Sequence, residues 1–212
     1  TRLRALLAQQ VPGISAEVVR TDRDGTCRLD TDVAASDIQQ FVGLCQSSTE
    51  TSPEKAKQYL QRAVELYQGD LLSGRGTRFY EWVDERDDGG LSLRERYRES
   101  FYQASKRLAD LHFEDGRPDL AVPLLKNVLR FEPTLEDLVR QLYQCYGELH
   151  DLRSLIQEDR NLRQTLRQVY YDPSDPEDEP GYYEPEPETV ELFNQIRAEL
   201  DADIAIGGIR GK

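Results

Sequence analysis

Apolar residues recur at three- and four-residue steps from Asp37 onwards, which is the spacing of one face of an α-helix. Each apolar stripe is too wide for a helix surrounded by water, so each helix must pack on its neighbours. The pattern predicts a mainly α-helical protein with helices over residues 38–45, 56–67, 97–111, 121–129, 135–149, 152–169 and 190–200.

The N-terminal stretch AEVVRTDRDGTCRLD, residues 16–30, has a different pattern. The β-branched residues Val18 and Val19 precede a polar Asp-Arg-Asp-Gly turn, and a short second run follows it. This order is typical of a β-hairpin. We therefore expect one hairpin before the helices.

The helices after residue 100 repeat with a period of 34 residues. A shift of 34 places Ala104 on Leu138 and Leu108 on Leu142, and the clearest unit, 101–133, closes at Pro133. Two helices per 34 residues is the tetratricopeptide spacing. An earlier pair at 37–69 has a similar second helix, so we predict a tetratricopeptide-like helical-repeat array of about three helix pairs plus a closing helix. Unrelated amphipathic helices are the alternative.

Two segments interrupt the helical pattern. Residues 69–90 are Gly-rich but lack a phosphate-loop signature, and we expect Trp82, with Phe79 and Tyr80, to pack onto the repeats rather than bind a ligand. Residues 172–188 contain eight acids and five prolines, which predicts an extended, solvated loop. Their order does not match a calcium-binding loop. Residues 207–212 are expected to form a flexible tail.

The charge is unevenly distributed. The whole chain has a formal net charge of −13, whereas residues 1–30 carry five arginines against four acids. Contacts with a nucleic-acid backbone are therefore expected only at the N-terminal end. Elsewhere the acidity indicates solubility or a cationic protein partner.

Chemistry-bearing residues are sparse. Cys27, Cys45 and Cys145 lie far apart and His112 and His150 are isolated, so we predict no catalytic site, no metal site and no cofactor. We interpret the cysteines as thiols in a reducing cytosol, which predicts a cytoplasmic protein. There is no apolar run of about 20 residues, so no membrane contact is expected. Because the chain starts at Thr1 and contains no Met, we expect a fragment of a longer protein.

Seven stretches follow one another in a specific order along the chain: Arg2–Leu7, Val18–Asp30, Asp37–Phe41, Ala63–Leu72, Trp82–Arg86, Phe131–Gly147 and Glu184–Ile196. Their order and spacing resemble the SARP family of bacterial transcription activators, in which a winged helix precedes a bacterial transcriptional activator domain. Cys27 stands where the family usually has an aromatic residue, Tyr67 stands where it has Trp, and residues 154–158 lack its usual pattern.

The resemblance implies that residues 1–31 are the trailing part of a winged-helix DNA-binding domain and 32–206 the activator domain. The implied partners are promoter DNA, through the intact winged helix, and RNA polymerase or a second copy of the chain, through the repeats. The candidate DNA contacts are Arg2, Arg4, Arg20, Arg23 and Arg28.

Other interpretations stay open at the level of sequence. The arginines could be exposed residues that only increase solubility. The chain could be a peptide-binding scaffold or adaptor with no DNA role, or a regulatory domain of a larger signalling ATPase. No sequence pattern here identifies the target promoter, activation or repression, a small-molecule effector or the oligomeric state.

Overall fold

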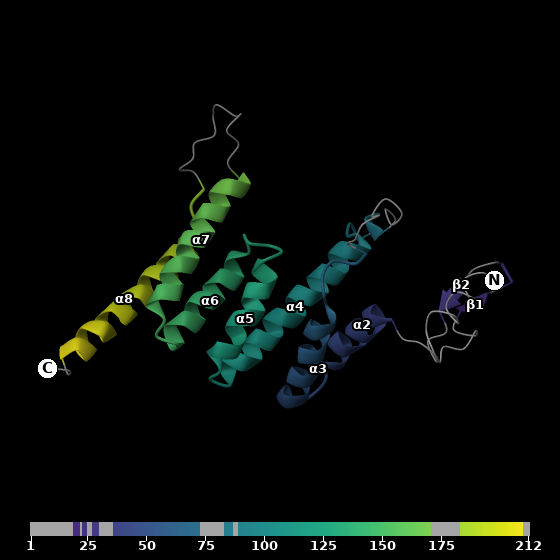
Figure 1. Ribbon diagram of the computed structural model, residues 1–212, viewed down its shortest axis with the longest axis horizontal. Helices are drawn as coiled ribbons and strands as arrows, with labels where there is room; N and C mark the ends of the chain where they lie inside the picture. Colours follow the sequence, from purple (N-terminus) through teal and green to yellow (C-terminus); the bar gives the residue numbers. More distant parts are fainter. Residues whose placement is uncertain are drawn as a thin grey trace, which may run out of the picture. The chain divides into compact units, whose positions relative to one another are not determined.

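The computed structural model describes residues 19–21, 23–24, 27–29, 36–72, 83–86, 89–170 and 183–209. Its contacts divide the chain into two compact units, Thr1–Ser73 and Gly74–Lys212. Seven helices, α2 to α8, make up most of the described residues, so the prediction of a mainly α-helical protein is confirmed (Figure 1).

The first unit contains two short strands and two helices. Strands β1 (Val19–Thr21) and β2 (Cys27–Leu29) pair antiparallel, with Val19 opposite Leu29. Residues 1–18 lie outside the described residues, so the interpretation of these strands as the wing of a winged helix stays a prediction.

Helices α2 (Asp37–Ser47) and α3 (Pro53–Leu66) pack on each other in this unit. Ser36 begins α2 with a capping box, in which its hydroxyl accepts the backbone N–H of Gln39 and the Gln39 side chain accepts the backbone N–H of Ser36. Pro53 stands in the first turn of α3, a position that suits proline because it needs no N–H donor.

The second unit is a row of five helices: α4 (Leu93–Glu114), α5 (Pro118–Leu129), α6 (Glu136–Glu148), α7 (Leu152–Tyr170) and α8 (Pro187–Ile209). Each of α4 to α7 packs on the next helix in the chain, and α8 packs on both α6 and α7 (Figure 1). Gly116, at φ +71°, and Pro118 make the turn from α4 to α5.

The predicted 34-residue period is visible in the core of this unit. Both members of each related pair of apolar positions are buried, so equivalent positions of successive helix pairs form one continuous core. The pairs are Ala104 and Leu138, Leu108 and Leu142, Ala121 and Leu155, and Val128 and Leu162.

The end of the acidic segment 172–188 differs from the extended, solvated loop that its composition predicts. Helix α8 begins at Pro187, and Pro185 is buried. Glu184 pairs with Arg163 and Arg167 of α7. Arginine side chains on the neighbouring helix thus hold this end of the segment in place, which composition alone does not reveal. Residues 172–182 lie outside the described residues, and α8 continues to Ile209, inside the predicted tail.

A polar network joins α6, α7 and the segment before α8. Asp159 of α7 is only 8% exposed, accepts a hydrogen bond from the Tyr143 hydroxyl at 3.4 Å and pairs with Arg163 at 2.9 Å. Burial, and secondly the Asp159 charge, raise the pKa of Tyr143 above its usual range, so this phenol stays a donor. Arg163 also contacts Glu184, which connects the network to the chain entering α8.

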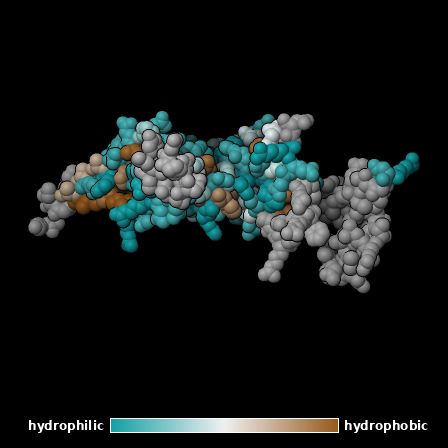
Figure 2. Space-filling model, turned by 90° about the horizontal axis from the view of Figure 1, so that it is seen from above, coloured by the Kyte–Doolittle hydropathy of each residue, from teal (hydrophilic) through white to brown (hydrophobic). Residues whose placement is uncertain are grey.

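The surface of the molecule is mostly hydrophilic on the face shown in Figure 2, with an apolar patch near the C-terminal end of α8. In that part of α8, Ile204 is 61% exposed. The predicted packing of Trp82, Phe79 and Tyr80 falls outside the described residues, although the neighbouring Val83 is fully buried.

The L142A substitution should destabilise the second unit. Leu142 is completely buried between the helices, so truncation leaves a cavity and is expected to lower the free energy of unfolding by about 2–5 kcal/mol. Urea denaturation followed by circular dichroism measures this loss. The control is L120A, since Leu120 of α5 is 38% exposed and should lose much less. Equal losses would contradict the assignment of Leu142 to the core.

The D159N substitution tests the polar network. It removes the charge that pairs with Arg163, and we expect unfolding to cost about 1–3 kcal/mol less, the usual range for a hydrogen bond to a charged group. D201N is the control, because Asp201 makes an exposed pair with Arg197 and should change stability by no more than about 0.5 kcal/mol. The same denaturation experiment compares the two variants. If D159N left the free energy of unfolding unchanged, the network would be dispensable for stability.

Candidate functional site

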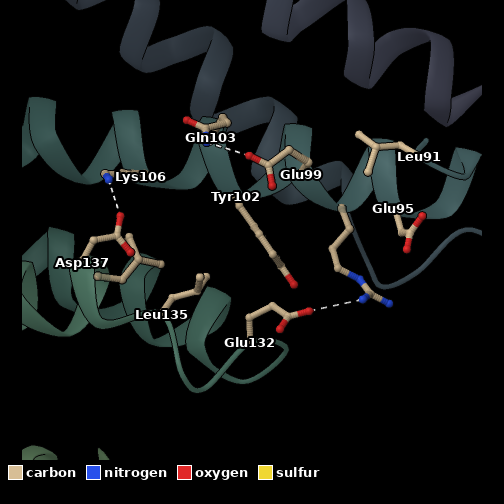
Figure 3. Close-up of a pocket in the computed structure, with 11 residues that line it drawn as sticks. Leu91, Glu95, Glu99, Tyr102, Gln103, Lys106, Glu132, Leu135 and Asp137 are labelled. Atoms are coloured by element: carbon tan, nitrogen blue, oxygen red, sulfur yellow. Dashed lines mark hydrogen bonds and ion pairs between the residues drawn. The ribbon is translucent and has the colours of Figure 1, made fainter. Parts of the chain in front are cut away.

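A groove, which we also call the first pocket, lies between α4 and the start of α6, with a volume of about 440 Å³. The capping box of Ser92 and Glu95 holds the first turn of α4 at one end of it. Tyr102 points into the space between the two helices (Figure 3). Leu138 of α6, and Leu135 at the cap position just before that helix, supply the rest of an apolar floor.

Carboxylates dominate the rim of this groove. Arg98 pairs with Glu132 at 3.4 Å, and Lys106 Nζ lies 2.5 Å from a carboxylate oxygen of Asp137 (Figure 3). Glu99 instead accepts a hydrogen bond from the Gln103 amide at 2.8 Å. The rim therefore holds more negative than positive charge.

Hydrogen bonds within the Ser92 capping box lower the pKa of Glu95, another rim residue. The carboxylate accepts the backbone N–H of Ser92, and this bond favours its ionised form. Glu95 therefore stays charged at neutral pH and adds to the negative potential of the groove.

A second pocket of about 460 Å³ lies between the end of α6 and α8, with Phe113 of α4 at its side. Its rim includes Glu148, Glu199 and Asp203, and the last pairs with His150 at 3.5 Å. Helices α6 and α8 approach closely here because residue 147 is glycine: a Cβ at that position would lie 3.1 Å from a methyl carbon of Ile196.

Among the residues that the structure describes, no group of three His, Cys, Asp or Glu side chains could hold a metal ion. Burial raises the pKa of both described thiols, Cys45 and Cys145, to about 11, so little nucleophilic thiolate forms at neutral pH. Apolar floors with charged rims suit a protein segment.

The arginines predicted to contact DNA lie in the first unit or outside the described residues. Arg2 and Arg4 belong to the part of the chain that is not described. Arg20 of β1 and Arg28 of β2 are partners in the strand register, and Arg23 is exposed in the turn between the strands. Their contact with DNA stays a prediction.

Sequence reasoning did not single out the groove residues. The groove exists because α4 and α6, which are not consecutive in the chain, lie close enough for Lys106 to reach Asp137. One signal was present in the 34-residue period, because Arg98 and Glu132 are separated by that interval and form an ion pair. Without the fold, such a pair cannot be told from other charges in an acidic chain.

Comparison with known proteins gives one match. The model of the family described as "Bacterial transcriptional activator domain" matches residues 36–175, more than half of the chain. No curated protein and no solved structure matches. None of the described helices combines the length and the apolar character needed to cross a membrane. The chain thus belongs to the bacterial transcriptional activator domain family of SARP-type transcription regulators, which is not a family of enzymes.

Proposed function

We propose that this chain is part of a cytoplasmic SARP-type regulator whose helices form a tetratricopeptide-like protein-interaction domain, residues 32–206. Residues 1–31 would be the end of a winged helix that contacts promoter DNA, with β1 and β2 as its wing. The observation that carries the proposal is the family match over residues 36–175, which begins after these strands and just before α2.

The charge distribution supports this division of roles. Phosphate contacts come from Arg and Lys, and the net positive part of the chain is residues 1–30, where the strands lie. The rest of the chain is too acidic to attract DNA, but its helical rows offer grooves of the kind that stacked helix pairs use to bind proteins. RNA polymerase or a second copy of the chain are the proposed partners.

A second candidate function is a peptide-binding adaptor without a DNA role, which the two charged-rim pockets also favour. The two functions differ in one observable. A regulator of this type selects promoter fragments from genomic DNA, and its affinity for them falls steeply with salt. An adaptor selects none.

The charge reversals R20E and R23E, made together in the intact protein, test the wing. We expect promoter affinity to fall about tenfold and the slope of log affinity against log salt to become shallower by about 2, since two phosphate contacts are lost. Fluorescence anisotropy with the selected fragment at several salt concentrations measures both quantities.

The control for that experiment is the pair K55E and R62E, which changes the net charge equally at exposed residues of α3. If both pairs of reversals weaken binding equally, the effect comes from overall charge and the wing has no specific role. Failure of the unaltered protein to select any genomic fragment would favour the adaptor.

A further inference from the structure

The first and second pockets described above share one face of α6. Asp137 lines the first pocket, and Gln144 and Glu148 line the second. An α-helix turns about 100° per residue, so these three positions point within about 40° of one another. A ligand lying along this face of α6 can therefore reach both pockets.

Helix α4 has the same arrangement. Glu99 and Lys106 line the first pocket and Phe113 the second, each seven residues after the last, which again keeps them on one side of the helix. Between the pockets, the Gln141 amide of α6 donates a hydrogen bond to Asp110 of α4. The surface between the two helices is thus continuous from one pocket to the other.

This surface is strongly acidic. The first pocket contributes Glu95, Glu99, Glu132 and Asp137, and the second contributes Glu148, Glu199 and Asp203. We call the surface that carries these seven carboxylates the acidic face. The cations that line it are Arg98 and Lys106, each already paired with one of the carboxylates, and His150, which pairs with Asp203 only when protonated. Arg86, which does not line either pocket, pairs with Glu95 at 3.5 Å.

Three carboxylates of the acidic face have no arginine or lysine within ion-pair distance among the described residues: Glu99, Glu148 and Glu199. Glu99 and Glu199 accept hydrogen bonds only from glutamine amides. All three side chains are exposed. A cationic ligand would replace water around them and reduce the repulsion among them.

Apolar side chains lie beneath the charges at both ends of the acidic face. Tyr102 and Leu138 are buried at the first pocket, and Ile196 and Leu200 at the second. Asp137 and Glu148 are eleven residues apart on α6, which corresponds to about 16 Å along the helix axis. A ligand that fills both pockets therefore carries two apolar anchors spaced on that scale, with positive charge between them, an arrangement that a segment of a protein provides.

We propose that the acidic face binds a basic segment of a partner protein, in which two aliphatic side chains about 16 Å apart enter the two pockets and lysine or arginine side chains face Glu99, Glu148 and Glu199. In an α-helical segment the two anchors are about eleven residues apart. The proposal rests on the proposed role of the helices as a protein-interaction domain and specifies the chemistry of the partner.

A designed peptide tests this proposal with the 212-residue chain. The probe is a fluorescein-labelled, helix-forming peptide of Lys and Ala with two Leu anchors eleven positions apart, and its binding is followed by anisotropy. We expect the combined substitutions E99K, E148K and E199K to weaken binding at least tenfold. All three residues are exposed, so we expect the variant to fold, and circular dichroism verifies this.

The matched control is E50K, E54K and E65K, three exposed acids of the first unit, which gives the same change in net charge. This control should weaken binding less than threefold. Equal loss in both variants would overturn the proposal, because the probe would then respond only to total charge. Equal affinity for a probe in which Glu replaces Lys would also overturn it.

Two further measurements distinguish the two-pocket binding mode from simple charge attraction and from self-association. A probe with both Leu anchors changed to Ala should bind at least fivefold more weakly, and unchanged affinity would exclude the two-pocket mode. If sedimentation shows a dimer that the three acidic-face substitutions dissociate, a second copy is the occupant and the proposal is wrong. The peptide assay contains no DNA. If the peptide does not bind, the proposed promoter binding is unaffected, and if the protein binds no promoter, the result of the peptide assay still holds.

Discussion

The buried carboxylate of Asp159 connects the three C-terminal helices of the second unit. A charge removed from water costs several kcal/mol unless it is paired and hydrogen-bonded, and Asp159 meets this requirement with the Tyr143 hydroxyl and the Arg163 guanidinium. Arg163 then also contacts Glu184 in the segment that leads into α8. One buried charge therefore links α6, α7 and the start of α8.

The position of α8 determines the shape of the surface beside α6. Once its N-terminal end is held, Phe193 packs against the Tyr143 ring with 5.7 Å between centroids, and Ile196 lies against Gly147. Polar positions of α8 then align with those of α6 along the second pocket. The acidic face is thus a consequence of core packing, because the buried sides of the helices dictate which residues stay outside.

Membership in a family of transcription regulators gives the division of charge a meaning. Residues 1–30 carry a net positive charge and the remainder a large negative one. In a regulator that brings DNA and protein together, opposite charges at the two ends favour different partners and keep the helical part away from the phosphate backbone. The proposed basic partner segment and the proposed wing follow the same electrostatic logic at opposite ends of the chain.

The sequence alone determined the features that depend on local rules. Helical periodicity, Pro53 in a first turn, Gly116 in a turn and the 34-residue period each reflect contacts within one helix or between neighbours in the chain. Only the tertiary structure decided that Glu184 meets Arg163 and that Lys106 meets Asp137. Those pairs join separate helices, and in a chain with 40 acidic residues, composition does not say which carboxylate each cation will reach.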